Sequence, residues 1–349
     1  MEARSTTSLA WDHWHIEVSS ICSLRCPRCP RAEVPESLLN KSLTVDFFKN
    51  QIGLNIVQQI KKITFCGNDG DPIYCKEFLE ICKWIKQANP ELQLTIITNG
   101  SYRQPNWWKE LAKLLNSKDE IHWSLDGWNQ SSNEQYRINC NWNSIVSGIK
   151  TFTRHNQSTY RVWASIAFSF NEQQLQKQID LARQWKFDLY QLTKSTKFGS
   201  KYPSTYGKDD LLQPKTASLV SSSNRFERET TMLSNKVRAN TALKKLFLQR
   251  ADNLAKHTVN SGICMIGNKG VFLNSQGEFY PCCWTANRYE HNQSWHELAR
   301  TKFNLYANTF EQILSDSFWD SDFLKFDSFE CRTKCTHEKL SDIEHTTEW

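Results

Sequence analysis

Three cysteines near the amino end of this 349-residue chain constrain its fold more than any other feature. They stand in the run Cys22-Ser-Leu-Arg-Cys26-Pro-Arg-Cys29, directly after residues 15–19, whose alternating apolar pattern predicts a strand. With 12 cysteines placed at random in the chain, about 0.014 matches to this spacing are expected. Three thiolates bind three irons of a cubane iron–sulfur cluster and leave the fourth iron open to a ligand. The spacing therefore predicts a [4Fe–4S] cluster that does chemistry on a bound molecule.

A structural zinc site is the alternative interpretation of the same cysteines. Tetrahedral structural zinc takes four ligands, and no His or Cys follows Cys29 within the next dozen residues. The iron–sulfur interpretation is therefore favoured.

Length and composition bound the class of protein. The chain is long enough for one large domain, or for a domain of about 200 residues and a smaller one. Neither a secretory signal in the first fourteen residues nor a run of 18 apolar residues is present, so the sequence predicts no membrane association. Cysteines without an export signal favour cluster ligation in a reducing compartment, which predicts a cytoplasmic protein.

Strand and helix patterns alternate over the first two hundred residues. Strands are predicted at 15–19, 62–66, 92–98, 121–125, 162–168 and 189–192. Helices are predicted at 45–60, 75–87, 107–115, 145–152 and 173–185. This α/β repeat predicts a parallel sheet, and six units suit a partial (β/α)6 barrel better than a closed barrel of eight strands. Chemistry in such folds lies at the carboxyl ends of strands, where the cysteine run stands.

The cysteine run after a first strand resembles the cluster loop of the radical S-adenosylmethionine (radical SAM) superfamily. Pro30-Arg31, which follows it, is similar to a subset of that family whose loop reads CPxCPR. The residue before the third cysteine is usually aromatic in the family and lies near the adenine of the cofactor. This chain has Arg28 there, and a guanidinium also stacks on aromatic rings. The resemblance implies a partial barrel of radical SAM type and S-adenosylmethionine as cofactor.

A second similarity lies in the loop 67–72, after the second predicted strand. Its glycines let backbone groups approach a ligand, and its carbonyls and carboxylates accept hydrogen bonds from an ammonium group. A structural turn is the alternative. The family has Gly-Gly-Glu-Pro here, which holds the amino group of the cofactor's methionine, and Gly70-Asp71-Pro72 resembles it with Asp for Glu. The resemblance implies cofactor contacts from Gly67, Asn68, Asp69, Gly70, Asp71 and Pro72.

Two more strand ends resemble family patterns. Thr98-Asn99-Gly100 follows the third strand, and Ser124-Leu125-Asp126-Gly127, with Arg137 further on, follows the fourth. In the family, the Ser/Asp pair lies near the ribose of the cofactor and an Arg lies near its carboxylate. The resemblance implies cofactor contacts from Asn99, Ser124, Asp126 and Arg137.

The last third of the chain holds a second set of cysteines. Cys264, Gly277 and Cys282 form a C-x12-G-x4-C pattern, and residues 270–282 read as a hairpin. A hairpin brings its two ends to one edge. Cys331-x3-Cys335 follows after a helix predicted at 303–314.

This second set resembles the SPASM and twitch extensions of radical SAM proteins, which bind auxiliary iron–sulfur clusters. The resemblance implies a second [4Fe–4S] cluster in a small α+β domain, with Cys283 as a possible replacement for Cys282. A zinc ion on the same ligands is the alternative. The implied ligands are Cys264, Cys282, Cys331 and Cys335.

The patterns divide the chain into five parts. They predict a tail at 1–14, a radical SAM barrel at 15–200, a basic and mostly helical connecting segment at 201–260, the auxiliary cluster domain at 261–340 and a tail at 341–349. The connecting segment carries 11 Lys/Arg against 5 Asp/Glu, which equals the whole net charge of +6. A solvated helical face explains this charge, and an anionic substrate is the alternative.

The resemblance implies an enzyme, either an oxidoreductase or a modifying enzyme. A reduced cluster gives one electron to S-adenosylmethionine, and the resulting 5′-deoxyadenosyl radical takes a hydrogen atom from a substrate. A one-electron reductant such as flavodoxin or ferredoxin supplies the electron. Families with this extension act on peptides, protein residues or small alcohols, and the basic segment leaves a nucleotide or nucleic acid open. Because only about fourteen residues precede the first strand, no N-terminal peptide-binding domain is expected.

Two other functional classes stay open. A two-cluster electron-transfer protein needs no methionine site, so the loop 67–72 speaks against it. A zinc-dependent nucleic-acid-binding protein fits the positive charge, but the chain has neither zinc-finger spacing nor a run of mixed basic and aromatic residues. The sequence identifies no catalytic acid or base.

Overall fold

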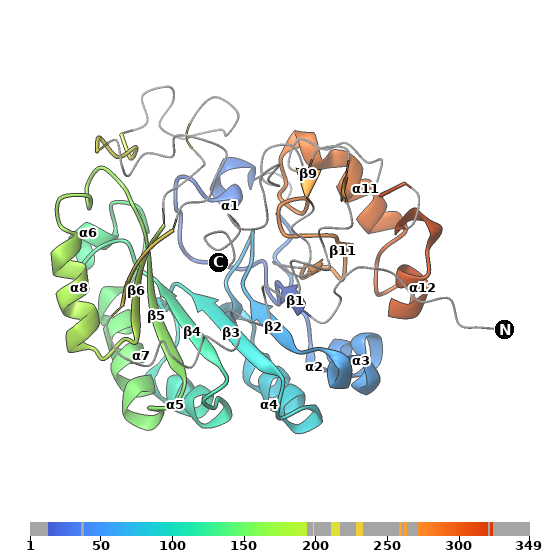
Figure 1. Ribbon diagram of the computed structural model, residues 1–349, viewed down its shortest axis with the longest axis horizontal. Coiled ribbons are helices and arrows are strands. Elements are labelled where there is room, and N and C mark those ends of the chain that lie inside the picture. Colours follow the sequence, from blue (N-terminus) through green and yellow to red (C-terminus); the bar gives the residue numbers. More distant parts are fainter. Residues whose placement is uncertain are drawn as a thin grey trace.

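The computed structural model describes residues 13–35, 38–193, 198, 211–216, 228–232, 258–259, 262–263, 271–319 and 322–323. Nine strands of this part form one open sheet in the order β11-β10-β1-β2-β3-β4-β5-β6-β7. Helices α4, α5, α7 and α8 cover its outer face (Figure 1). Two short strands, β8 (Thr258–Val259) and β9 (Gly262–Ile263), pair separately.

The six strands predicted from the repeat are present and parallel to their neighbours. Their bounds are β1 His13–Ile16, β2 Lys62–Phe65, β3 Gln93–Thr98, β4 Glu120–Ser124, β5 Tyr160–Ile166 and β6 Leu189–Thr193. The sheet does not close on itself, because its edges are β11 and β7. The predicted α/β fold with a partial parallel barrel is therefore confirmed.

The C-terminal hairpin extends this sheet beyond β1. β10 (Val271–Leu273) runs parallel to β1, and β11 (Phe279–Tyr280) runs antiparallel to β10. The hairpin predicted over 270–282 is thus confirmed, and it is continuous with the barrel sheet.

Helices connect the parallel strands. Those of the first two hundred residues are α1 Pro30–Glu33, α2 Val45–Phe47, the π-helical turn Phe48–Ile52, α3 Leu54–Gln59, the 3-10 turn Pro72–Tyr74, α4 Phe78–Ala88, α5 Pro105–Leu114, α6 Gln130–Asn133, α7 Trp142–His155 and α8 Leu175–Gln184. The single helix predicted over 45–60 is wrong, since it divides at Gly53. That residue has a φ of 80°, which ends one helical turn before α3 begins.

Two further predictions of helix need correction. The helix predicted over 303–314 forms only as α12 (Phe310–Leu314), because the backbone of Phe303 and Leu305 bonds to the hairpin instead. Helix α11 (Gln293–Thr301), between 3-10 turns at Glu290–Asn292 and Ser317–Trp319, was not predicted.

In the connecting segment 201–260, expected to be mostly helical, residues Arg228–Met232 form strand β7. They pair antiparallel with the open edge of β6, and their two threonines favour a strand.

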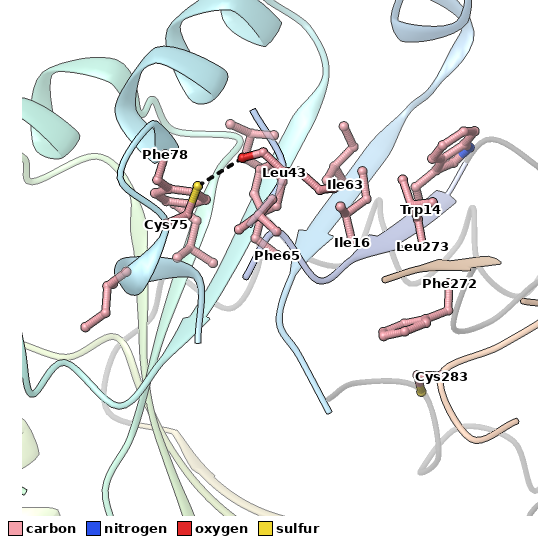
Figure 2. Packing of buried hydrophobic residues seen from close by; sticks show 14 of the residues in the cluster. Trp14, Ile16, Leu43, Ile63, Phe65, Cys75, Phe78, Phe272, Leu273 and Cys283 are labelled. Carbon is pink, nitrogen blue, oxygen red and sulfur yellow. Dashed lines mark hydrogen bonds between the residues drawn. The ribbon is translucent and has the colours of Figure 1, made fainter. Parts of the chain in front are cut away.

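Between the outer face of the sheet and its helices lies a core of aromatic and aliphatic side chains. Phe65 on β2 packs on Phe78 of α4, with ring centroids 5.1 Å apart (Figure 2). Trp123 on β4 packs on Trp108 of α5 and on Phe152 of α7. The outer face therefore accounts for much of the chain's aromatic content.

The inner face of the same sheet is polar. Register pairs His15 with Thr64 and Thr64 with Thr95, and paired residues share a face. By the same alternation His122 and Gln191 belong to this face. A parallel sheet covered on both faces is normally apolar on both. A polar inner face is the arrangement expected of a sheet that encloses a polar ligand.

Candidate cofactor and cluster site

The cluster loop leaves the carboxyl end of β1 and ends at α1, whose N-cap is Cys29. Cys26 is buried, while Cys22 and Cys29 are half-buried. The nine cysteines in the described part of the chain form no disulfide. Burial raises the pKa of Cys22 to about 12, and the pKa of Cys26 also rises by burial and by the nearby Cys29 and Cys22 thiols. The three thiols therefore lie near one another.

These residues fit an iron–sulfur cubane by their donor chemistry. Each of three thiolates binds a different iron of such a cluster, so the sulfurs need not converge on one point. A single ion would require convergence, and among the residues described no three His, Cys, Asp or Glu side chains are grouped in that way.

Asn99, at the carboxyl end of β3, joins the cluster loop to the loop 67–72. Its side-chain Nδ2 lies 3.6 Å from the Cys22 Sγ and 2.7 Å from Oδ2 of Asp71, and it donates to both. Its backbone N–H also donates to Oδ2 of Asp71, at 2.6 Å. One residue thus contacts both of the loops predicted to bind cluster and cofactor.

Asp71 is almost fully buried and is held by protein donors on both oxygens. Besides the two bonds from Asn99 to Oδ2, its Oδ1 accepts from the Thr98 hydroxyl at 2.8 Å and from the Ile73 backbone at 3.1 Å. Burial raises the pKa of Asp71 to about 6 against these bonds. A carboxylate offers about four acceptor positions, and these four donors occupy them. Because three of the donors come from Thr98 and Asn99, Asp71 fixes the loop 67–72 to the end of β3. Its contact with the cofactor's ammonium stays a prediction.

Glu17, the residue after β1, holds the backbone of the loop 67–72 through its carboxylate. Its Oε1 accepts from the backbone N–H groups of Asp69 and Gly70, at 2.6 and 2.9 Å. A Cβ on Gly67 would lie 2.3 Å from this same oxygen, and a Cβ on Gly70 would lie 2.0 Å from the carbonyl oxygen of Ser19. Both glycines are therefore required by close packing against the end of β1.

Glu17 itself was not predicted as a site residue. A carboxylate at the end of the first strand, shortly before the cysteine run, was the available signal. Burial and the neighbouring Asp69 carboxylate raise the pKa of Glu17 to about 8.

Asp126 and Arg137 form a buried ion pair at the carboxyl end of β4. The Arg137 Nε lies 2.6 Å from Oδ2 of Asp126, and Asp126 is 0% exposed. Oδ1 of Asp126 accepts from the backbone of Ile166 at 2.7 Å. Arg137 lowers the pKa of Cys26 against the effect of burial, which places its charge beside the cluster loop.

In the structure, Asp126 is therefore the buried ion-pair partner of Arg137. Ser124 is the last residue of β4 and is half-buried at the same sheet edge. The predicted ribose contacts of Ser124 and Asp126, and the carboxylate contact of Arg137, stay predictions.

The residues beside the third cysteine also join the two loops. Arg31 donates through Nη1 to the carbonyl oxygens of Ser20 and Asp69, at 2.5 and 3.1 Å. The Cys29 Sγ lies 3.8 Å from the carbonyl oxygen of Asn68. Arg28 is buried, with its guanidinium 5.2 Å from the ring centroid of Phe198.

The second cysteine set is described in part. Cys282 is half-buried two residues after β11, and its neighbour Cys283 is buried. The side chain of Asn68 donates to the carbonyl oxygen of Cys283 at 2.8 Å, so the extension contacts the loop 67–72. Three of the predicted auxiliary ligands lie outside the described residues, namely Cys264, Cys331 and Cys335.

Comparisons with known proteins agree with this geometry. Residues 16–174 match the radical SAM superfamily, and no curated protein sequence matches the chain. Streptococcus suis SuiB bound to S-adenosylmethionine is similar with a TM-score of 0.55 and 13% identity, over 92% of this chain and 67% of that one. The protein anSMEcpe with bound AdoMet and Cp18Cys peptide is similar with a TM-score of 0.55 and 14% identity, over 96% and 87%.

At these identities the structural likeness shows the fold. No helix within the described ranges has the length and apolar character needed to cross a membrane. The family match runs from Ile16, the last residue of β1, to residue 174, just before α8, and therefore includes every strand end described above up to β5. Residues 16–174 of this chain are a radical SAM domain.

Proposed function

We propose that this protein is a radical SAM enzyme that holds a [4Fe–4S] cluster on Cys22, Cys26 and Cys29 and cleaves S-adenosylmethionine beside it. The observation that carries the proposal is the double contact of the cluster loop. Asn99 bonds to Cys22 and also to Asp71 of the loop 67–72, and Cys29 contacts Asn68 of that loop. An electron carrier has no need for such a coupled loop.

The bound cluster would supply the one electron, received from a reductant such as flavodoxin or ferredoxin, that splits S-adenosylmethionine into methionine and a 5′-deoxyadenosyl radical. That radical would take one hydrogen atom from the substrate and leave as 5′-deoxyadenosine. The chain's own residues bind and orient. Arg137 offers a fixed positive charge for the cofactor's carboxylate, and backbone carbonyls of the loop 67–72 offer acceptors for its ammonium group.

The inner face of the sheet supports a polar substrate. Among the residues described there, the Thr95 Oγ1, the His122 Nδ1 and the Gln191 Oε1 are buried without a hydrogen-bond partner. Buried polar atoms normally have partners, and each one without a partner costs free energy. A hydroxyl, amide or carboxylate of a bound substrate would satisfy such atoms.

Peptides are the substrate class best supported by analogy. Two proteins of the same fold are SuiB, solved with the precursor peptide SuiA, and anSMEcpe, solved with the Cp18Cys peptide. We infer a peptide or protein residue as substrate, with a small alcohol or a nucleotide as alternatives. We also infer a cytoplasmic setting, since cysteine ligation of iron–sulfur clusters requires a reducing compartment.

We further infer a second [4Fe–4S] cluster on Cys264, Cys282, Cys331 and Cys335. Four thiolates leave no open iron, so this cluster would transfer electrons or shape the substrate site. Cys283, the next residue along the chain, is the alternative to Cys282 as the ligand. A zinc ion at this site would make the extension a structural element.

Anaerobic reconstitution with iron and sulfide tests these assignments. Iron content and the visible spectrum separate the cluster protein from a zinc-dependent nucleic-acid-binding protein, which would take zinc instead. Addition of S-adenosylmethionine and a strong reductant then separates the enzyme from an electron carrier. The enzyme should release 5′-deoxyadenosine, whereas a carrier would keep the cofactor intact.

A further inference from the structure

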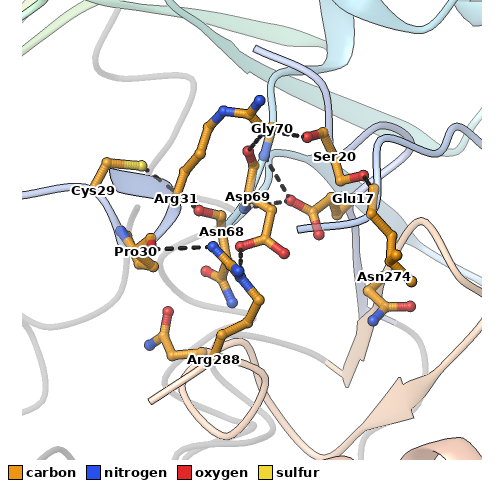
Figure 3. Close-up of polar contacts among 12 residues, drawn as sticks. Glu17, Ser20, Cys29, Pro30, Arg31, Asn68, Asp69, Gly70, Asn274 and Arg288 are labelled. Atoms are coloured by element: carbon orange, nitrogen blue, oxygen red, sulfur yellow. Dashed lines mark hydrogen bonds and ion pairs between the residues drawn. The ribbon is translucent and has the colours of Figure 1, made fainter. Parts of the chain in front are cut away.

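Arg288, in the C-terminal extension (the part of the chain from β10 onward), contacts the loop 67–72, which is the predicted cofactor loop. The Nε of Arg288 lies 2.7 Å from Oδ1 of Asp69, and its Nη2 lies 3.1 Å from the carbonyl oxygen of Pro30. Figure 3 shows the guanidinium between these two acceptors. The side chains of Arg288 and Asp69 are 8% and 12% exposed, so this is a nearly buried ion pair.

The partner of Arg288, Asp69, is fixed through its backbone as well as its side chain. Besides its side chain, Asp69 uses its backbone N–H, which donates to Glu17, and its carbonyl, which accepts from Arg31. Its neighbours Gly67 and Gly70 have no side chains through which the loop could be fixed. Removing one partner of a buried ion pair leaves an uncompensated charge, which is strongly unfavourable.

The extension holds the loop at a second point. Asn68 donates to the backbone of Cys283, five residues before Arg288. Internal hydrogen bonds fix the form of residues 283–292. The Asn287 backbone N–H donates to the carbonyl oxygen of Trp284, and the Asn292 side chain donates to the carbonyl oxygens of Trp284 and Asn287. The segment that carries a predicted auxiliary ligand therefore contacts two consecutive residues of the cofactor loop.

We propose that Arg288 is a positioning residue for cofactor binding. It holds the loop 67–72 against the start of α1, directly after the last cluster cysteine, so that the cofactor site is complete only when the C-terminal extension is docked. This inference rests on the proposed function, since it concerns the affinity for S-adenosylmethionine. Its consequence is that Arg288 affects cofactor binding through the loop 67–72, which it holds in place.

The test compares Arg288→Gln with wild type in reconstituted full-length protein. Equilibrium binding of S-adenosylmethionine should weaken about tenfold or more, as expected for a lost charged hydrogen bond that positions the site. Iron content should stay at the wild-type level, because Arg288 is not one of the predicted cluster ligands. Arg288→Lys should recover part of the affinity, since lysine keeps the charge but cannot bond to both acceptors as a fork.

Arg161→Gln is the matched control. It breaks another buried ion pair, between Arg161 and Asp188 at 3.2 Å. This pair lies near the amino end of β5, whereas the predicted cofactor site lies at the carboxyl ends of the strands. This control should lower stability and leave the affinity within about twofold of wild type. Equal losses in both variants would mean general destabilisation and would overturn the proposal.

Asp69→Asn provides a second variant if Arg288→Gln does not fold. Its amide oxygen still accepts a hydrogen bond but carries no charge, so a weaker affinity is expected again. Wild-type affinity in either variant with full iron content overturns the positioning role alone. A wild-type protein that takes up iron but neither binds nor cleaves S-adenosylmethionine overturns the proposed function, and this inference with it.

Discussion

The side-chain amide of Asn99 donates a hydrogen bond to the Sγ of Cys22 at 3.6 Å, which joins the end of the third strand to the first cysteine of the cluster loop. The same amide also bonds to Asp71. A single side chain thus fixes the distance between the proposed cluster site and the proposed cofactor loop. Because the bonds to Asp71 involve a charged acceptor, they belong to the stronger class of hydrogen bonds.

Asn99→Ala should therefore weaken binding of S-adenosylmethionine. The loss of a hydrogen bond to a buried charged group is worth about 1.5–3 kcal/mol, so the dissociation constant should rise roughly ten- to hundredfold. Equilibrium binding to reconstituted protein measures it, with iron content as the check that the cluster is retained. An unchanged dissociation constant would mean that the amide only stabilises the cluster loop.

Two threonines of β3, Thr95 on the polar inner face and Thr98 at the carboxyl end of the strand, provide a comparison that tests the inner face. Thr95 Oγ1 has no hydrogen-bond partner, while the hydroxyl of Thr98 donates to Asp71. Thr98→Val should lower the free energy of unfolding by about 1.5–3 kcal/mol, and Thr95→Val should change it by less than about 0.5 kcal/mol or raise it. Urea unfolding of both variants measures the difference. Equal losses would mean that the Thr95 hydroxyl is bonded within the protein and is not available to a ligand.

Glu17 should make stability depend on pH. Its pKa is raised from the ordinary 4.5 to about 8, so between these values the folded protein binds a proton that the unfolded chain has released. Stability from this group is present below about pH 4.5 and is lost as the pH rises toward about 8, at up to about 1.4 kcal/mol per pH unit. The groups that face Glu17 are Asp69, Arg288, Tyr280 and Cys66.

Glu17→Gln keeps an acceptor for the loop but cannot ionise. Relative to wild type it should become steadily more stable as the pH rises through this window. Anaerobic urea unfolding at several pH values tests the sign. Parallel curves for the two proteins would show that the Glu17 carboxyl titrates as it does in the unfolded chain.

The C-terminal cysteines give an iron-counting prediction. Two [4Fe–4S] clusters would bring about eight irons per chain. Joint substitution of Cys331 and Cys335 by Ala should reduce this to about four and leave 5′-deoxyadenosine production without substrate largely intact. Stoichiometric zinc together with about four irons in the parent protein would instead favour the zinc alternative.

Local pattern was sufficient for the strands and for the position of the cysteine loop after β1, while its role as a cluster ligand stays a prediction. Alternating and β-branched residues identified β1 to β6, and the parallel order then placed the strand-end loops at one edge of the sheet. The contact between Asn99 and Cys22 bears out that placement. The sequence was misleading where one glycine decides the backbone, since the apolar periodicity of 45–60 continues through Gly53 while the helix does not.

Contacts between distant segments left no local signal. The pairing of β10 with β1 joins the last third of the chain to its first strand, and no periodicity specifies that partner. Arg288 appears in the sequence as one basic residue among many, and only the fold brings it to Asp69. Asp126 resembled a ligand contact because its type and position were visible, whereas its burial behind Arg137 depends on tertiary packing.

Reductive cleavage of S-adenosylmethionine is the measurement that tests the central claim most directly. Reconstituted wild-type protein with a strong reductant should form 5′-deoxyadenosine and methionine in equal amounts, slowly in the absence of substrate. The variant with Cys22, Cys26 and Cys29 all replaced by Ala should form neither and should lose about four irons. Wild-type protein that carries its full complement of iron, yet produces no 5′-deoxyadenosine, would contradict the account.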